Sequence, residues 1–276
     1  MDFTIKTYKL LLQTLISKGY AFQTFCQFLK KPLEKVIVLR HDVDLLPLNS
    51  LRFAKIQHEV GICGSYYFRM VTESYNESII KEIASLGHEI GYHYETMDTT
   101  SSKFKVQSLK FKDKDEERDV IINGAYEEFC KNLEHFRTLC PVKTICMHGS
   151  PRSKFDNREI WKHFSYKELG LIGEPYFDID FNKVFYLTDT GRRWDGYKVS
   201  VRDKMPQQET WNSQGLRFSS TNDIVRAINH EKFPHQVMFT FHPQRWNNSL
   251  LPWAKEFAWQ NVKNVVKGII IRETKN

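Results

Sequence analysis

Two aspartates and an arginine follow a run of apolar residues early in the chain. The run Val36–Leu39 is rich in Val and Ile, which is typical of a buried strand. Because side chains alternate across a strand, Arg40, Asp42 and Asp44 are predicted to share one face. Carboxylates at the end of a buried strand are costly to desolvate unless they are paired or bind a metal. The spacing therefore indicates a charged site, and a strand that simply ends in solvated polar residues is the alternative.

Other residues that could do chemistry also follow predicted strands. Strand-like and helix-like segments alternate along most of the chain, which predicts a parallel sheet with helices outside it. In a parallel βα barrel the site lies at the carboxyl ends of the strands. Besides the two aspartates, the residues at or just after these ends are Arg69, His93, Glu95, His148, Asp189, Arg192 and His242. Three of the ten histidines lie at strand exits, which favours one shared site.

These elements are expected to form one domain that spans residues 1–276. Helices are predicted at residues 4–18, 49–60, 77–86, 119–138, 221–229 and 250–266. Strands are predicted at residues 36–39, 63–68, 88–93, 143–147, 171–172, 184–187, 197–201 and 237–241. No break in composition divides them. We therefore expect an α/β barrel, and a doubly wound open sheet is the alternative.

Composition narrows the class of protein. The chain has 276 residues, 41% of them hydrophobic, and a net charge of +7. No apolar run is long enough to span a membrane and no secretory signal is visible, so we expect a cytoplasmic protein without a transmembrane segment. The five cysteines lack CxxC spacing and predict neither a disulfide framework nor a zinc knuckle. The charge favours phosphorylated substrates or peripheral contact with lipid headgroups, whereas the lack of any nucleic-acid motif argues against nucleic acid.

Two Arg–Trp pairs and one glycine-containing segment are candidates for substrate binding. One pair is Arg193 with Trp194, and the other is Arg245 with Trp246. Such pairs commonly stack on sugar rings, although they also occur on ordinary surfaces. The segment Asp189–Arg193 is a candidate for binding a phosphate or a carboxylate, unless its glycine merely forms a β-turn.

Several of these segments resemble the motifs of the polysaccharide deacetylase family of carbohydrate esterases, over about residues 34–245. The matching segments are Arg40–Asp44, Gly87–His93 and Phe239–Pro243. The chain also resembles one branch of the family, which is associated with bacterial surface-polysaccharide (O-antigen) gene clusters. The segments that carry this second resemblance are Arg40–Asp44, His93–Glu95, Met147–Pro151 and Asp189–Arg192. The resemblance implies a distorted (β/α)7 barrel and a hydrolase that removes the acetyl group from an N-acetylated sugar.

The resemblance also implies roles for single residues. Asp42 would be the general base and His242 the general acid. Asp44 and His93 would bind a divalent metal, which the resemblance implies is Zn²⁺. An ionised Asp42 would be favoured if Arg40 or Arg202 approached it.

One position departs from the family pattern. The second motif normally supplies two histidines to the metal, but residue 97 is Met97, a poor ligand for Zn²⁺. His148, at the exit of another predicted strand, is the first candidate to replace the missing ligand, and Glu95 is the second. Asp44, His93 and His148 would leave coordination positions for water and substrate.

The expected substrate is a sugar linked to a nucleotide or to a lipid diphosphate, because the chain is basic and cytoplasmic in this interpretation. The residues expected to bind it are Arg40, Arg69, Glu95, Asp189, Arg192, Trp194, Arg245 and Trp246. Two alternatives stay open. One is a metal-free hydrolase on the same fold, since related barrels that lack the histidine pair hydrolyse C–N bonds of other small molecules. The other is a glycan-binding pseudoenzyme, although a binder needs neither the acid nor the base.

Overall fold

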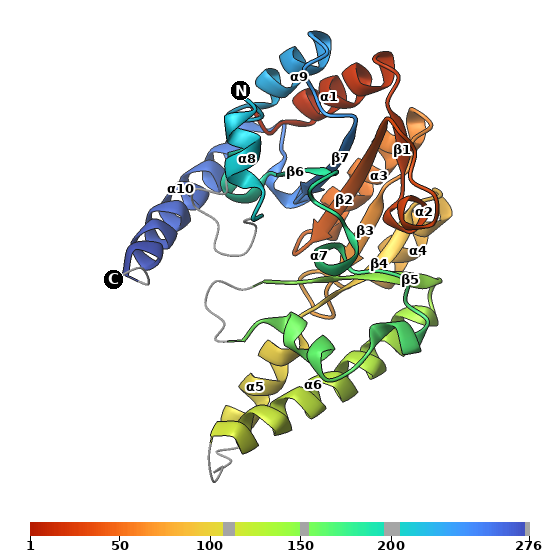
Figure 1. Ribbon diagram of the computed structural model, residues 1–276, viewed down its shortest axis with the longest axis vertical. Helices are drawn as coiled ribbons and strands as arrows, with labels where there is room; N and C mark the ends of the chain where they lie inside the picture. Colours follow the sequence, from red (N-terminus) through yellow and green to blue (C-terminus); the bar gives the residue numbers. More distant parts are fainter. Residues whose placement is uncertain (107–113, 150–154, 196–204, 274–276) are drawn as a thin grey trace.

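One parallel sheet forms the centre of the protein in the computed structural model, which describes residues 1–106, 114–149, 155–195 and 205–273 (Figure 1). The strands run in the order β5-β4-β3-β2-β7-β6, and β1 pairs with the first half of β2. All pairings are parallel. The strands are β1 Ala21–Gln23, β2 Val36–Val43, β3 Ser65–Phe68, β4 Glu89–Tyr94, β5 Val142–Met147, β6 Phe185–Thr188 and β7 Gln236–Phe241.

The sheet is curved into an open barrel. β2 and β4 are separated by β3, yet the side chains of Asp42 and His93 approach to 3.7 Å on the inner face. β5 and β6 end the strand order, and in the described ranges no ladder joins them. An isolated bridge between Thr144 and Gly173 extends the β5 edge toward the gap. The predicted fold class, an α/β protein with a distorted (β/α)7 barrel, is confirmed.

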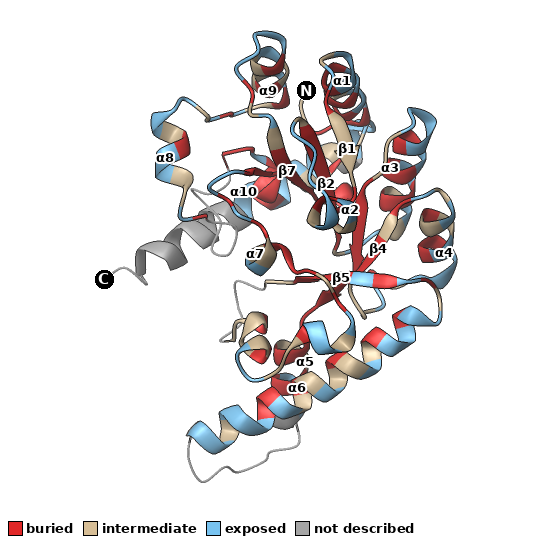
Figure 2. Ribbon diagram, turned by 45° about the vertical axis from the view of Figure 1, so that its right-hand side comes forward, coloured by how far each residue is buried: buried red, intermediate tan, exposed pale blue. Residues whose placement is uncertain are grey.

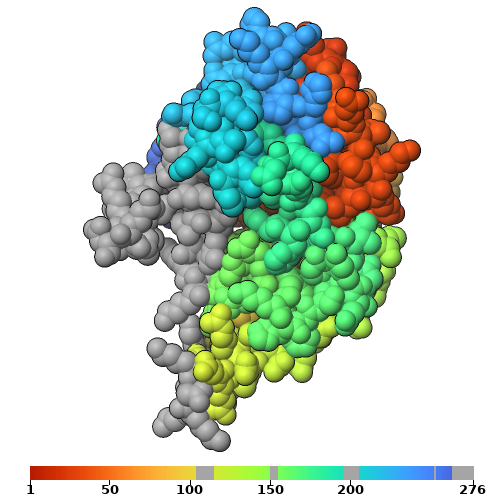
Figure 3. Space-filling view, viewed as in Figure 1, coloured from red at the N-terminus to blue at the C-terminus, as the bar shows by residue number. Residues whose placement is uncertain are grey.

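Helices cover the outside of the sheet, whose strands are largely buried (Figure 2). The helices α1 (Ile5–Ser17) and α9 (Thr221–Asn229) pack side by side although they are far apart in sequence, as the red and blue segments at the top of Figure 3 show. The α-helices are α1 Ile5–Ser17, α2 Phe25–Lys30, α3 Pro47–Glu59, α4 Glu77–Ser85, α5 Thr96–Val106, α6 Lys114–Arg137, α7 Pro175–Asp178, α8 Gln208–Ser213, α9 Thr221–Asn229 and α10 Leu250–Glu273. The 3₁₀ helices are η1 Asn157–Lys162, η2 Tyr166–Leu169, η3 Thr190–Arg192 and η5 Pro243–Arg245.

Most predicted elements are confirmed, with ends that differ by a few residues. The sequence pattern does not predict β1, α2, α5, α7 and α8. Of these, α5 is mostly polar, and the other four are too short to show a period. The predicted strand at 171–172 is wrong, since only the adjacent Gly173 makes a bridge. The predicted strand at 197–201 lies outside the described residues, as do Arg202 and the end of the segment Met147–Pro151.

Glycine at position 91 allows the barrel interior to be filled below the site. A Cβ atom at Gly91 would lie 2.3 Å from the ring of Tyr67 on the neighbouring strand. Tyr67 can therefore cross over β4, where its hydroxyl meets Thr144 Oγ1 on β5 at 2.9 Å. The glycine of this motif thus serves the packing of three adjacent strands.

Alternation along β2 sends neighbouring side chains in opposite directions. Arg40 and Asp42 point into the barrel, whereas His41 points out to α1 and α3. His41 stacks on Tyr66 with ring centroids 4.1 Å apart, and its Nδ1 donates to the carbonyl oxygen of Ser65 at 3.1 Å. His41 therefore supports the strand and does not take part in the site.

We expect His41 to make the fold sensitive to acid. Burial lowers the pKa of His41 from 6.5 to about 3. The pKa of His41 is lower in the folded than in the unfolded state, so its contribution to the free energy of unfolding is complete above about pH 6.5. That contribution is lost as the pH falls toward 3, by up to about 1.4 kcal/mol per pH unit. Urea unfolding at pH 7, 6 and 5 checks this. The variant His41→Asn, which cannot titrate, should show a shallower pH slope, and an equal slope would contradict the prediction.

In the described part of the chain, none of the helices combines the length and apolar character that crossing a bilayer requires.

Candidate metal centre and catalytic site

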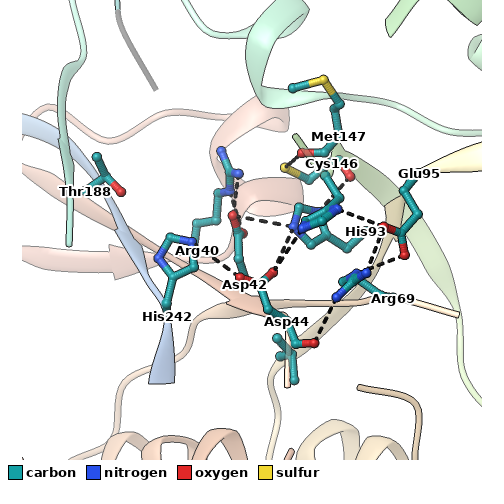
Figure 4. Close-up of polar contacts among 12 residues, drawn as sticks. Arg40, Asp42, Asp44, Arg69, His93, Glu95, Cys146, Met147, Thr188 and His242 are labelled. Atoms are coloured by element: carbon teal, nitrogen blue, oxygen red, sulfur yellow. Dashed lines mark hydrogen bonds and ion pairs between the residues drawn. The ribbon is translucent and has the colours of Figure 1, made fainter. Parts of the chain in front are cut away.

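The charged side chains at the strand exits meet in one place at the open end of the barrel. β2 contributes Asp42 and the following Asp44, and β4 contributes His93. β5 and β7 are followed by His148 and His242. Parallel strands bring their carboxyl ends to one edge, so residues that are far apart in sequence face one another (Figure 4).

Asp42 is held by a two-point ion pair at the base of this site. Arg40 Nε lies 2.8 Å from Asp42 Oδ1, and Arg40 Nη2 lies 2.6 Å from Oδ2. Both side chains are buried. Burial alone raises the pKa of Asp42, but the charges of Arg40 and His93 outweigh it and hold that pKa below its usual range. Arg40 is therefore the partner that keeps Asp42 ionised. The sequence predicts that it binds substrate, whereas the structure places Nε and Nη2 of its guanidinium on the two oxygens of Asp42.

Asp44, His93 and His148 are arranged as metal ligands. Asp44 Oδ1 lies 3.6 Å from His93 Nε2 and 3.8 Å from His148 Nε2. The three ligand atoms lie within 4.8 Å of one another. Asp44 Oδ1 is buried and has no hydrogen-bond partner among the residues that the structure describes. An unpaired buried carboxylate oxygen that faces two imidazole nitrogens fits a bound cation, since such atoms are otherwise hydrogen-bonded.

The second ring nitrogen of each histidine also has a polar neighbour. His93 Nδ1 lies 2.9 Å from the carbonyl oxygen of Cys146, and His148 Nδ1 lies 2.9 Å from Glu95 Oε2. Metal-binding histidines usually direct their second ring nitrogen to a carbonyl or a carboxylate, which fixes the tautomer and the ring orientation. Each His Nε2 is thereby turned toward Asp44.

Arg69 and Glu95 support this arrangement from the ends of β3 and β4. Two nitrogens of Arg69 contact the two carboxylate oxygens of Glu95 at 2.9 and 2.8 Å, and Nη1 donates to the backbone oxygen of Asp44 at 3.1 Å. Burial raises the pKa of Glu95, but His148 and Arg69 outweigh it and lower that pKa to about 2. The sequence predicts that both side chains bind substrate. The structure instead places them behind His148 and Asp44.

A second group of possible ligands, Asp42, His93 and Cys146, shares His93 with the first. It fits a metal less well, because Arg40 occupies both oxygens of Asp42 and its positive charge would repel a cation. Asp44, His93 and His148 bring one carboxylate and two imidazoles, which are ligand types of Zn²⁺. Asp44, His93 and His148 are therefore the group that fits a divalent ion.

Met97 lies away from these ligands. Its side chain is fully buried in a second hydrophobic cluster with Ile121, Ile122 and Ile160, between α5, α6 and η1. Glu95, the other candidate replacement, is paired with Arg69 and His148. Of the two candidates, His148 is the one that the structure places beside Asp44 and His93.

His242 is oriented by a buried carboxylate. Its Nδ1 lies 2.6 Å from Asp189 Oδ1, and its Nε2 lies 3.8 Å from Asp44 Oδ2. Asp189 Oδ2 also accepts hydrogen bonds from the backbone N–H of His242 at 2.9 Å and from the indole N–H of Trp246 at 2.6 Å. Arg245 Nη1 donates to Asp189 Oδ1 at 3.1 Å. Burial raises the pKa of Asp189, but the charges and hydrogen bonds of His242 and Arg245 outweigh it and keep that pKa low.

Five of the residues that the sequence predicts to bind substrate have other contacts in the structure. Asp189 and Arg245 orient His242. Trp246 is fully buried among aromatic rings, and Trp194 is buried against Phe239 and Phe241, so neither indole can stack on a sugar. Arg192 lies under α10, with its guanidinium 4.6 Å from the ring of Trp253. The two indoles fill the core next to the strand ends, and the polar groups of Asp189, Arg245 and Arg192 contact other residues of the chain, so the structure gives these five residues contacts other than the predicted ones.

Two residues near the site carry no signal in the sequence. The ring of Tyr176 in α7 contacts two guanidinium groups, that of Arg40 at 5.5 Å and that of Arg158 at 5.1 Å. Gln244 in η5 donates from Nε2 to Asp44 Oδ2 at 3.3 Å. Neither follows a predicted strand directly, and tyrosine and glutamine are common in ordinary surface segments, so their types alone give no reason to select them.

No family model and no curated protein matches the sequence. Among solved structures, the chain is similar to a CE4 family pseudoenzyme from Bacillus anthracis, at 13% identity and a TM-score of 0.39. It is also similar to two mutants of that protein, one described as having restored enzymatic activity, at 14% identity and TM-scores of 0.39 and 0.38. Each match covers 86% of this chain but only 63–65% of the other, so the chain spans less than two thirds of those proteins.

Proposed function

We propose that this chain is a metal-dependent hydrolase that removes the acetyl group from an N-acetylated sugar. The observation that carries the proposal is the meeting of three parts in one site. An ionised carboxylate at Asp42, a ligand group around Asp44 and a carboxylate-bound imidazole at His242 face one another. These are the parts that hydrolysis of an amide needs: a base, a Lewis acid and an acid. The motif resemblance to polysaccharide deacetylases supports the choice of an acetamide.

Asp44, His93 and His148 would hold the ion, for which we propose Zn²⁺ because of the mixed carboxylate and imidazole ligands. When bound, such an ion supplies Lewis acidity, which polarises a carbonyl group and makes a water molecule more acidic. Arg40 is bound to Asp42, so its charge is directed at the base and not at the ligand group.

The protein's own residues move the protons. Asp42, kept ionised by Arg40, is placed to take a proton from the attacking water. His242 presents Nε2 to the same space, and a protonated imidazole there delivers a proton to the leaving amine. Asp189 stabilises the positive charge of that imidazole and fixes its orientation through Nδ1. The acid and the base therefore have different buried partners: Asp189 for His242 and Arg40 for Asp42.

The carrier of the sugar belongs to the same proposal. The net charge of +7 favours an anionic substrate, and we propose a sugar linked to a nucleotide or a lipid diphosphate. The resemblance to the O-antigen branch supports a role in the cytoplasmic assembly of a bacterial surface polysaccharide. Release of the amine before polymerisation would then introduce a positive charge into the growing glycan.

The test is acetate release by the purified chain after chelation and reconstitution with Zn²⁺. We expect acetate from a nucleotide-diphosphate or lipid-diphosphate N-acetylhexosamine, and no release by the chelated protein. Activity that survives exhaustive chelation would replace the proposal with a metal-free hydrolase of C–N bonds. Tight sugar binding without any turnover, unchanged in Asp42→Asn, would replace it with a glycan-binding pseudoenzyme.

A further inference from the structure

Gln244 lies beside the proposed metal site and is almost fully buried, at 8% exposure. It belongs to η5, the short turn that follows His242. Asn49 at the start of α3 donates to the carbonyl oxygen of Pro243 at 3.3 Å and so ties this turn to the neighbouring helix. The backbone of Gln244 is therefore held in place, and its side chain reaches across to the end of β2.

The amide of Gln244 has only one possible orientation toward Asp44. An ionised carboxylate accepts hydrogen bonds and cannot donate them, so the amide must present its NH₂ group. Gln244 Nε2 lies 3.3 Å from Asp44 Oδ2. The second carboxylate oxygen, Oδ1, is then left to face His93 and His148. Gln244 thus contacts only one of the two carboxylate oxygens of Asp44.

The amide oxygen of Gln244 indicates that the contact with Asp44 determines the orientation of the glutamine side chain. Gln244 Oε1 is buried and has no hydrogen-bond partner among the residues that the structure describes. A glutamine that served only the scaffold would have both ends of its amide paired, because an unpaired buried acceptor costs about 1–3 kcal/mol. The amide NH₂ group donates to Asp44, so the carboxylate sets the position of the amide.

Without the amide, the Asp44 carboxylate has a competing partner. His242 Nε2 lies 3.8 Å from Oδ2, so a small rotation of the carboxylate would bring these two atoms into hydrogen-bond contact. Rotation toward His242 would move Oδ1 away from the two histidines. A neutral donor at Oδ2 prevents that rotation without adding a charge to the ligand group.

We propose that Gln244 is a positioning residue that fixes the rotation of the Asp44 carboxylate and thereby raises the affinity of the site for its metal. The inference rests on the proposed function, since it assumes that Asp44, His93 and His148 bind a divalent ion. Hydrogen-bond partners behind a metal ligand typically change metal affinity by about 10–100-fold. Gln244 belongs to this class of partner although no signal in the sequence marks it.

The experiment measures Zn²⁺ affinity by competition with a chromophoric chelator in the wild type and in Gln244→Met, which keeps the length of the side chain and removes the donor. We expect the Kd of Gln244→Met to be about 10–100-fold higher. The visible absorption of the Co²⁺-substituted protein should also change, because it reports ligand geometry. Gln236→Met is the matched control. Gln236 begins β7, the strand that leads to His242 and Gln244, and its amide donates to the carbonyl oxygen of Leu33 at 2.7 Å, at the opposite end of that strand from the site.

A second variant covers the case in which Gln244→Met does not fold. Gln244→Asn keeps the amide but is one methylene shorter, so it cannot reach Asp44 and should weaken binding in the same direction. A Kd within about twofold of the wild type in the folded variants, with an unchanged Co²⁺ spectrum, would overturn the inference alone, because a lost partner behind a ligand should cost more than that. A wild-type chain that binds neither Zn²⁺ nor Co²⁺ would overturn the proposed metal-dependent function, and the inference with it.

Discussion

Replacement of Asp42 by asparagine is expected to lower kcat by about 10²–10⁴-fold, the usual contribution of a general base. Asparagine keeps the shape of the side chain but cannot accept a proton at neutral pH. Asp42 is not part of the group Asp44, His93 and His148, so the variant should still bind about one metal ion per chain. The measurement is acetate release under saturating substrate, together with elemental analysis of the same sample.

The same change should also destabilise the fold, and this effect must be separated from catalysis. Arg40 is buried against Asp42, and removing one partner of a buried ion pair costs up to about 3–5 kcal/mol. The double variant Arg40→Gln with Asp42→Asn removes both charges and should recover much of that stability while staying inactive. Asp180→Asn is the control, because Asp180 is exposed and precedes β6, away from the strand exits. Near-normal turnover in the folded double variant would disprove the role of Asp42 as the base.

Replacement of His148 by alanine is expected to abolish metal binding, and with it activity. His148 Nε2 is one of the three ligand atoms of the proposed site, with Asp44 Oδ1 and His93 Nε2. Loss of a hydrogen-bond partner behind a ligand already costs about 10–100-fold in affinity, so loss of the ligand itself should cost at least about 100-fold. Elemental analysis after reconstitution with Zn²⁺ and desalting should show about one ion per wild-type chain and almost none in the variant.

Three further variants make this prediction specific. Glu95→Gln should bind metal more weakly than the wild type but more tightly than His148→Ala, because it weakens only the partner of His148 Nδ1. Adding Met97→His to His148→Ala should not restore binding, since Met97 packs in the second hydrophobic cluster and not at the strand exits. His230→Ala, at an exposed histidine after α9, is the control. A full complement of metal in His148→Ala would show that the ion is held elsewhere.

The positions of the reactive residues can be predicted from the sequence because these residues follow strands. Apolar runs rich in β-branched residues mark buried parallel strands, and the side chains that follow them share one end of a barrel. This rule selects Asp42, His93 and His242, and the structure brings all three together. Their proximity follows from topology alone, since each lies at the end of a neighbouring or nearby strand.

The partners of these residues cannot be predicted with the same success. The sequence leads us to expect Arg69 and Glu95 at the substrate, yet they pair with each other and support His148. It also leads us to expect Trp194 and Trp246 at a sugar ring, yet both are buried in the core. Whether a charged or aromatic side chain faces solvent, a ligand or a neighbouring side chain depends on the distance between loops, which the sequence does not encode locally.

Hydrophobic periodicity and β-branched composition are local properties, so they suffice to place the reactive residues at the carboxyl ends of the strands. How these residues combine emerges only from the folded barrel. Arg40 pairs with Asp42 there, and Asp44 Oδ1 is left facing His93 and His148. Asp189 likewise turns His242 toward the site. Pairing among buried charges depends on separations of a few ångströms across different strands, and barrel curvature and side-chain packing set these separations.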